Sequence, residues 1–382
     1  MPESVNIEPV PSRRSMSWIS KVIWVLNWFA IGGLLLAILA PFVNPAVFWP
    51  LAFWGLLFPV FLLFNGVFLL YWWWRKRRQG WFTLIAILIS IPYWGDYLQP
   101  GFHHNAEPPT KGINVVSYNV KLFDLYNWSN NTQSKSIMFN QLNSLMPEIL
   151  CVQEFYTEDA GANRNLDSLK NLLVLPYVHA EYTITLRKDD HWGIATFSRY
   201  PIVNQGRIQF NNRTNNICIY TDITVGTDTI RVYNMHLQSV SLGYADLNFL
   251  KNPEQNKDDV AASKNILRRM KAAYIKRSGQ ANAIAKHIAE CHYPVIVCGD
   301  FNDTPNSYAY RTIKGNMNDA FIESGKGFGQ TFINDWPAPR IDYMLFSNRF
   351  SSYQFKIHEE MNISDHYPIS TKLELHPVEV DH

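Results

Sequence analysis

Cysteine is scarce in this chain of 382 residues, and its placement argues against a structural role for thiols. Only four cysteines occur, and no two of them have the C-x-x-C spacing of zinc sites or thiol oxidoreductases. Cys151, Cys218 and Cys298 each lie inside an apolar run typical of a strand, where a thiol packs as a small hydrophobe. The sequence therefore predicts neither a disulfide framework nor a zinc centre.

Charge is also scarce, at 17% of residues, and it is unevenly distributed. The first hundred residues hold seven of the 34 Lys and Arg and three of the 32 Asp and Glu, which leaves 27 basic and 29 acidic residues beyond them. A domain so close to neutral lacks the broad positive field of a general polyanion binder. The 47% hydrophobic content excludes a disordered chain.

Long uncharged runs predict that residues 1–98 form a membrane region. Residues 22–40 are nineteen residues without a charge, which as a helix match the thickness of a bilayer core. A second apolar run, residues 47–74, ends in three tryptophans and then four basic residues, as at a membrane edge. This second run disfavours a cleaved signal peptide. We expect transmembrane helices at about 22–42 and 47–74.

A third apolar run, residues 81–94, leaves two topologies open. It contains Pro92 and is short, but a helix over about 81–98 would span, and we favour that span over an interfacial or re-entrant helix. One group of basic residues precedes the first span and another follows the second span. The positive-inside rule places these two basic groups in the cytoplasm. Two spans keep the rest of the chain there. Three spans, our expectation, make a multi-pass protein of the cytoplasmic (inner) membrane with the rest of the chain on its outer side, which is the periplasm if the source is a Gram-negative bacterium.

The remainder of the chain has the pattern of an α/β domain. Residues 99–112 have the proline, glycine and polar composition of a linker. Beyond them, β-rich runs joined by short turns, such as 217–225 and 229–237, predict antiparallel strands, and interspersed helical patterns predict that both sheet faces are covered. We expect one α/β domain over residues 113–376 with a mixed β-sandwich core.

A long helix with a basic first half is predicted over residues 263–290. The basic residues of that half have no acidic neighbour, and they are Lys264, Arg268, Arg269, Lys271, Lys276 and Arg277. They form either a solvated face beside the core, which is favoured, or a surface that faces lipid phosphates or an anionic substrate. An insertion from residue 239 to about 259 precedes this helix, and we expect it to form the rim of a substrate site.

Polar side chains repeatedly interrupt or follow apolar strands. Strand ends are where sites are built in α/β folds, although one such residue is usually a turn former or a helix cap. The repetition favours a site. Its candidate residues are Asn119, Glu154, Asn234, His236, Asp300, Asn302, Asp342, Asp365 and His366. Carboxylates suit a hard cation such as Mg²⁺, and hydrolysis at phosphorus needs a positioned water, a proton acceptor and donors for the developing charge.

These residues, in their order, resemble the endonuclease/exonuclease/phosphatase superfamily, which includes DNase I-like nucleases, neutral sphingomyelinases and inositol phosphatases. The resemblance covers about residues 113–376 and includes Asn-x-His at 234–236, Gly-Asp-x-Asn at 299–302 and Ser-Asp-His at 364–366. It implies a DNase I-like four-layer α/β sandwich with its site between the loop ends of the two sheets. It also implies hydrolysis of phosphodiester or phosphomonoester bonds with Mg²⁺, or Mn²⁺ as the alternative.

The resemblance further implies a metal site and an acid–base pair. Glu154 would be the principal metal ligand, and Asn119 and Asp365 would support it. His236 would protonate the leaving oxygen. Asp300 would align or deprotonate the attacking water. His366, paired with Asp342 or Asp365, would be either the base or a stabiliser of the transition state, so the identity of the general base stays open.

Substrate contacts are assigned to Asn234, Asn302 and Arg277, with Asn302 holding a phosphoryl oxygen. We expect a membrane-anchored phosphoesterase rather than an inactive scaffold of the same fold. A linker of about thirteen residues reaches only about 20 Å on average, so the site would work near the lipid bilayer. A phospholipid-like or small phosphodiester substrate is therefore favoured, and a membrane-tethered nuclease is the alternative.

Overall fold

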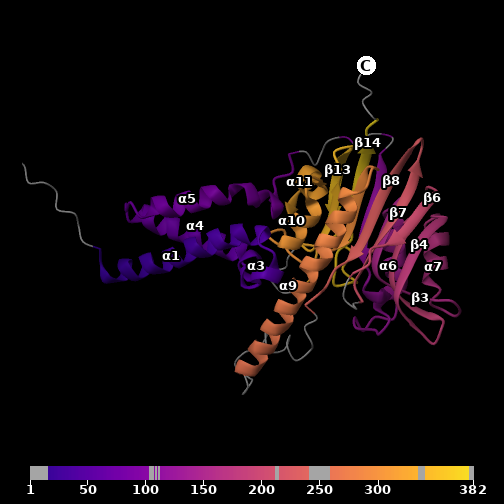
Figure 1. The fold of residues 1–382 in the computed structure, drawn as a ribbon, viewed down its shortest axis with the longest axis horizontal. Coiled ribbons are helices and arrows are strands. Elements are labelled where there is room, and N and C mark those ends of the chain that lie inside the picture. Colours follow the sequence, from indigo (N-terminus) through magenta and orange to yellow (C-terminus); the bar gives the residue numbers. More distant parts are fainter. Residues whose placement is uncertain are drawn as a thin grey trace, which may run out of the picture.

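Two six-stranded sheets packed face to face form the centre of the computed structural model, which describes residues 16–102, 107, 110, 112–210, 215–240, 259–333 and 340–377 (Figure 1). The first sheet has the order β10 (Asn318–Asp319), β12 (Asp342–Phe346), β9 (Val295–Asp300), β8 (Asp228–His236), β7 (Ile217–Val225) and β6 (Ile202–Arg207). The second has the order β13 (Phe350–Ile357), β14 (Ile369–Leu375), β2 (Ile113–Asn119), β3 (Ile149–Glu158), β5 (Asp190–Ser198) and β4 (Tyr177–Leu186). The pairs β8–β9 and β2–β3 are parallel and the other pairs are antiparallel, so both sheets are mixed.

Helices cover the outer face of each sheet and complete four layers. On the second sheet, α6 (Ser134–Ser144) and α7 (Asn165–Leu172) contribute Met138, Leu142 and Leu169 to the core. On the first sheet, α9 (Asp259–Ala289) and α10 (Tyr308–Lys314) contribute Ile284 and Ile313. Central strands such as β9 have continuous apolar sequences because both of their faces are covered. The four-layer α/β sandwich that the resemblance implies is confirmed.

The N-terminal region is a bundle of three helices that run side by side: α1 (Trp18–Leu39), α4 (Phe58–Trp74) and α5 (Gly80–Ser90) (Figure 1). Short elements lie at its end near the sandwich, namely η1 (Ala40–Phe42), α2 (Pro45–Phe48), α3 (Pro50–Leu56) and η2 (Ile91–Asp96). Polar side chains tie the helices together inside the bundle. Trp72 Nε1 and Thr83 Oγ1 both donate to the buried Asn27 Oδ1, at 2.7 and 2.8 Å.

The expected continuous helix over residues 47–74 is wrong. Pro50 and Pro59 divide this run, because proline lacks an N–H group and clashes with the preceding turn. The run forms α2, α3 and α4, and α3 meets α4 at a 62° bend. The third expected helix is also shorter, because α5 has eleven residues and the chain continues through Pro92 as the 3₁₀ helix η2.

One described helix, Trp18–Phe42, is long and apolar enough to cross a membrane by itself. The helices α3 and α4 are long and apolar enough to form a second span only if the two bent helices are counted together as one span. Helices of this kind near an N-terminus include anchors and signal sequences.

The bundle is attached to the sandwich by more than the predicted linker. The strand β1 (Leu98–Gln99) pairs antiparallel with β11 (Gly327–Phe328), so the first residue of the predicted 99–112 linker is held in a small sheet. Other parts of the sequence predictions lie outside the described residues: Arg13, Arg14, the linker positions 103–106, 108–109 and 111, and most of the expected rim, residues 241–258.

Candidate functional site

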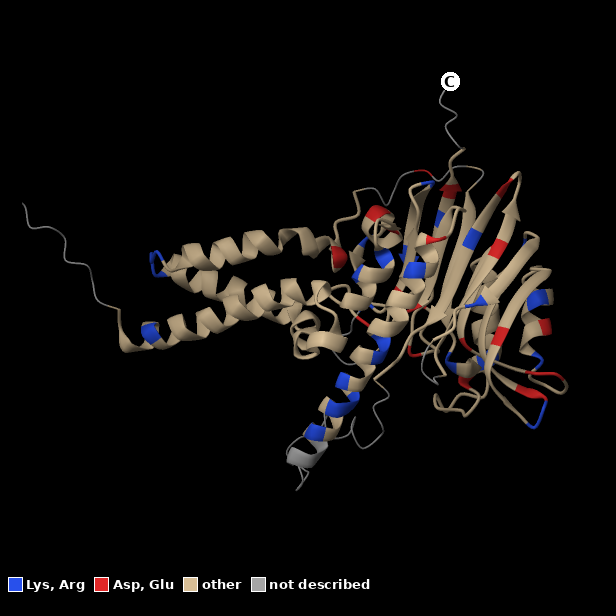
Figure 2. Cartoon of the chain, viewed as in Figure 1, with Lys and Arg blue, Asp and Glu red and all other residues tan. Residues whose placement is uncertain are grey.

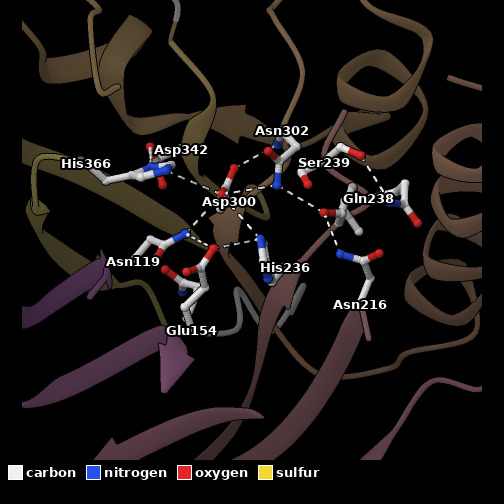
Figure 3. Close-up of polar contacts among 12 residues, drawn as sticks. Asn119, Glu154, Asn216, His236, Gln238, Ser239, Asp300, Asn302, Asp342 and His366 are labelled. Atoms are coloured by element: carbon white, nitrogen blue, oxygen red, sulfur yellow. Dashed lines mark hydrogen bonds and ion pairs between the residues drawn. The ribbon is translucent and has the colours of Figure 1, made fainter. Parts of the chain in front are cut away.

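Asp300, the last residue of β9, is the centre of a polar cluster at the strand ends (Figure 3). Its side chain is buried, and its Oδ2 accepts hydrogen bonds from Asn119 Nδ2 at 3.1 Å and from Asn302 Nδ2 at 3.2 Å. The backbone N–H of Asn302 donates to the other carboxylate oxygen at 2.8 Å. Asn119 ends β2 of the opposite sheet, so the two sheets meet at this carboxylate.

Gly299 allows the close strand approach that this arrangement needs. Its φ is +140°, and a Cβ atom there would lie 2.0 Å from the carbonyl oxygen of Met235 on β8. Only glycine fits so near a neighbouring backbone in this conformation. The parallel register of β8 and β9 then places His236 beside Asp300, and the antiparallel register of β12 places Asp342 on its other side.

Two histidines flank Asp300. His236 Nε2 lies 3.6 Å from Asp300 Oδ2 and also 3.6 Å from Glu154 Oε1. His366 Nε2 lies 3.7 Å from Asp300 Oδ2, and its Nδ1 lies 2.9 Å from Asp342 Oδ2. Of the two partners considered for His366, the structure therefore gives it Asp342.

Glu154 reaches the cluster from a distorted position in β3. The pairing of β3 with β5 shifts between Val152 and Phe155, and Glu154 lies in this bulge with φ +48°. A bulge re-aims a side chain, and a left-handed non-glycine residue is a strained one that the surrounding structure has to hold. The side chain stays about one-third exposed, and Asn119 Nδ2 donates to Glu154 Oε1 at 3.4 Å.

Burial and neighbouring charges set the protonation of the cluster. Burial raises the pKa of Asp300 to about 6, against the lowering effect of the His366 charge. Burial alone would lower the pKa of His366, but the carboxylates of Asp342 and Asp300 outweigh it and raise that pKa to about 10. The two carboxylates therefore favour the protonated form of His366, whose Nδ1 lies within hydrogen-bonding distance of Asp342 while its Nε2 faces Asp300 at 3.7 Å.

The donor atoms of the cluster fit a divalent cation. Asp300, Asp342 and His366 are buried and offer possible ligand atoms that lie within 4.8 Å of one another. A protonated imidazole binds no metal, so with His366 charged the two carboxylates are the available ligands of this group. Glu154 adds a partly exposed carboxylate at the edge of the cluster, and the buried Asn119 directs its amide group toward both carboxylates. An oxygen-rich set of this kind is what hard cations such as Mg²⁺ prefer.

Asp365 has a partner that the sequence did not suggest. Its Oδ2 lies 3.0 Å from Lys121 Nζ, and Lys121 begins a run of four residues with left-handed backbone that extends to Asp124. Lys121 Nζ also lies 5.4 Å from the ring centre of Trp128. No periodicity or motif marks such a turn, so Lys121 was missed, and its position two residues after Asn119 was the available signal.

Two of the expected substrate contacts are corrected by their burial. Asn234 is enclosed between the sheets, where its Nδ2 donates to Ala195 O at 2.9 Å and its Oδ1 accepts from Gln153 Nε2 at 2.7 Å. Arg277 is also buried, and its Nη1 lies 2.5 Å from Asp303 Oδ2. Neither side chain is available to a substrate, because each already binds groups of the protein.

Comparison with known proteins identifies two regions. A model described as the Endonuclease/Exonuclease/phosphatase family matches residues 116–366, which is more than half of the chain, and a model of a domain of unknown function matches residues 20–97. "Protein angel" of Drosophila melanogaster is 23% identical over 262 residues, covering 61% of this chain and 67% of that protein.

Among solved structures, an endonuclease/exonuclease/phosphatase family protein from Bacteroides thetaiotaomicron superposes with a TM-score of 0.51 at 16% identity, covering 72% of this chain and 99% of that one. A mannosyl-6-phosphatase from the same species gives a TM-score of 0.50 at 16% identity, covering 69% and 100%. At such identities these two structures show a shared fold and nothing about a shared substrate.

Proposed function

The chain belongs to the endonuclease/exonuclease/phosphatase family and is a metal-dependent phosphoesterase, and from this premise we propose that it uses Mg²⁺ to hydrolyse small or lipid-like phosphodiesters at a membrane surface. The observation that carries the proposal is the convergence of carboxylate, amide and imidazole groups from both sheets on Asp300 (Figure 3).

Glu154 and Asn119 would hold the metal, and Asp300 would lie next to that metal. When bound, the cation neutralises charge on the phosphoryl oxygens and brings a water into position. Mg²⁺ is favoured because the site is rich in oxygen, and Mn²⁺ is the alternative.

Asp300 acts as the general base in this proposal. Its pKa of about 6 leaves it ionised at neutral pH and close enough to the working pH to take a proton from the attacking water. The water oxygen forms the new bond to phosphorus while its proton goes to Asp300. His366, held as a cation by Asp342, stabilises the negative charge that develops on the phosphoryl group.

His236 acts as the general acid. Its Nε2 lies between Glu154 and Asp300, and its side chain is 17% exposed, so a leaving group can reach it. As the bond from phosphorus to the leaving oxygen breaks, that oxygen takes the proton from His236. Asn302 orients Asp300 through two hydrogen bonds and supplies an amide near the phosphoryl oxygens.

The test is turnover of an aryl phosphodiester by the full chain in detergent micelles, with metal removed by chelation and then restored. We expect activity to return with Mg²⁺, and Glu154→Gln to lose roughly a hundredfold or more, as for other charge-stabilising groups. Glu290→Gln, which changes an exposed carboxylate between α9 and the start of β9, at the opposite end of this strand from Asp300, is the matched control. A well-folded parental protein without metal-dependent turnover of any phosphoester would instead support the inactive scaffold.

Membrane insertion is supported by the reversed polarity of the bundle. Polar Asn27, Asn65 and Thr83 are fully buried, while Trp74 and Phe29 are 79% and 72% exposed. A water-soluble bundle has the opposite pattern, whereas helices in lipid associate through polar and small residues. We infer that α1 crosses the bilayer and that α4 and α5 enter it with α1.

The orientation follows from the charges at the two ends of the bundle. Lys21 lies in the first turn of α1 and the basic cluster 75–78 follows the last residue of α4, at the end of the bundle away from the sandwich, whereas Asp96 ends η2 at the opposite end (Figure 1). With the basic tip in the cytoplasm, the catalytic domain lies on the outer side. A topology reporter fused after Thr110 should then be active only as an extracytoplasmic reporter. Activity of a cytoplasmic reporter at this position would refute this orientation.

The substrate proposal rests on cations beside the end of the bundle nearest the sandwich. Lys271 Nζ of α9 lies 5.3 Å from the Trp49 ring centre, and the Arg311 guanidinium lies 3.8 Å from that of Phe42. If the bundle crosses the bilayer, cationic side chains at this end of the bundle would contact lipid phosphates. The basic first half of α9 projects from the sandwich on the same side as the bundle (Figure 2).

Phospholipid vesicles and plasmid DNA separate the lipid substrate from the nuclease alternative. We expect the double variant Lys264→Glu and Arg268→Glu to lower turnover of phospholipid in anionic vesicles and to leave turnover of the soluble aryl diester unchanged. Efficient, salt-sensitive cleavage of plasmid DNA without activity on phospholipids would establish the nuclease alternative.

A further inference from the structure

The loop that follows Asp300 is covered on its outer side by the N-terminal bundle. Asn302 belongs to the catalytic cluster, and four residues later Asn306 is buried, with 1% of its surface exposed. Asn306 Nδ2 donates to the carbonyl oxygen of Ala37 on α1 at 3.4 Å. Two residues later, at the start of α10, the hydroxyl oxygen of Tyr308 accepts a hydrogen bond from Asn44 Nδ2 at 3.3 Å. The loop thus connects the site to the bundle within six residues of Asp300.

The contact between α3 and this loop is made by backbone. A Cβ atom on Gly55 would lie 2.2 Å from the carbonyl oxygen of Asn306 and 2.9 Å from Cβ of Ala40. Such distances leave no room for any side chain, so α3 rests directly on the loop backbone. Glycine is otherwise an unfavourable residue inside a helix, and close approach of two backbones is a physical reason for it at this position.

A second chain of contacts links α3 to the same loop through α9. Phe53 of α3 packs edge-on against Tyr274 at 5.5 Å, and the guanidinium of Arg277 lies 5.4 Å from the Tyr274 ring centre. Arg277 then makes its buried ion pair with Asp303, three residues after Asp300. The buried Arg277 therefore connects α3, through Tyr274, to the loop at Asp303 instead of contacting a substrate.

The other side of the site is also attached to the bundle. Gly329 N–H, next to the β1–β11 pair, donates to Tyr97 O at 3.1 Å. Two residues later, Thr331 Oγ1 accepts from the backbone N–H of Asp342, and the carbonyl oxygen of Thr331 accepts from Tyr367 N–H. These bonds hold the segments that carry Asp342 and His366.

We propose that the N-terminal helical bundle is a positioning element of the active site, in which α3, through Gly55 and Asn306, fixes the loop that follows Asp300 and carries Asn302. The inference rests on the proposed role of Asp300 in hydrolysis. Gly55 and Asn306 touch no reacting atom and act through the loop backbone. The bundle therefore serves catalysis directly, in addition to any anchoring that it provides.

Gly55→Ala in the full chain tests the proposal. The added methyl group must displace the loop, and a displacement of about 1 Å at a catalytic group can cost up to about a hundredfold in rate. We expect kcat for a small aryl phosphodiester to fall about tenfold or more while KM changes less than twofold, because the diester contacts little of the protein. Gly66→Ala is the matched control, since a Cβ there meets nothing within 4 Å.

The outcomes separate this inference from the proposed function. If the parental protein hydrolyses no phosphoester, the proposed function fails. If the parental protein is active and a folded Gly55→Ala variant keeps the parental kcat, the positioning role is refuted. Should Gly55→Ala not fold, Asn306→Ala decides by the same criterion, because it removes the bond to Ala37 without adding an atom. A rise in KM with kcat unchanged would also contradict the proposal, since that would place Gly55 in substrate binding.

Discussion

Removing the charge of Asp342 should move the alkaline limit of activity toward neutral pH. The two carboxylates beside His366 raise its pKa to about 10, so the parental enzyme keeps the imidazolium up to that pH. An opposite charge within hydrogen-bonding distance typically accounts for about one to three pKa units, and Asp342 lies 2.9 Å from the ring. We therefore expect the Asp342→Asn variant to lose activity with a midpoint between about pH 7 and 9.

The direction follows from which form of His366 is active. If the cation stabilises the developing charge on phosphorus, activity is complete below the pKa of His366 and is lost as the pH rises through it. Each unit of pKa is worth about 1.4 kcal/mol of interaction with the cation, so a shift of one unit lowers the rate about tenfold at high pH. Both proteins are compared at saturating metal, so that the difference between their alkaline limits reports the charge of Asp342.

The assay is kcat/KM from pH 5 to 10.5 at saturating metal, with samples quenched into alkali so that product is read in one ionised form. Asp222→Asn is the control, because Asp222 is an equally buried carboxylate whose partner is Arg231, outside the site. It should lower stability and leave the alkaline limit unchanged. The reasoning is refuted if Asp342→Asn reduces activity equally at every pH, or if its limit moves to higher pH.

Three further predictions concern other residues. His236→Ala should lower kcat on an aryl diester about a hundredfold, and less when the leaving phenol is more acidic; equal losses across leaving groups would exclude it as the acid. Gly299→Ala should destabilise the fold by about 2 kcal/mol or more in urea unfolding, because its Cβ would meet Met235 O, whereas Gly279→Ala in an open stretch of α9 should be neutral or stabilising. Burial lowers the pKa of His179 to about 4, so unfolded chains bind its proton first and stability should fall by about 3 kcal/mol as the pH drops from 6.5 to 4; His179→Gln should flatten that slope.

The strand-end residues were predictable because the information is local. Glu154 and Asp300 each interrupt an apolar run, and such a run in an α/β domain is a buried strand with its end at a loop. That Asn119, Glu154, His236, Asp300 and His366 meet depends on the register of two sheets, which the order of motifs indicated only through the family resemblance. The hydrogen bonds and pKa values needed the structure.

Burial was harder to predict, and Arg277 shows why. It follows Lys276 in a stretch rich in basic residues, which suggested one basic surface. Helical periodicity, however, places Arg277 three residues after Tyr274 and four before Ala281, both of which face the core. The prediction of an accessible Arg277 followed the composition of the segment, whereas the structure shows the burial that corresponds to its phase in the helix.

The linker illustrates a limit of composition. Residues 99–112 look like a flexible connection, and a flexible connection would let the sandwich move independently of the bundle. The contacts that oppose this lie elsewhere in the sequence, at Gly55, Asn306 and Gly329, and no local pattern relates these three positions. Each is a short-range backbone or amide contact between segments that are distant in the chain. A chain cut at the predicted linker would uncover the buried Asn306 and deprive Gly329 N–H of its acceptor, so the catalytic domain is best studied together with its bundle.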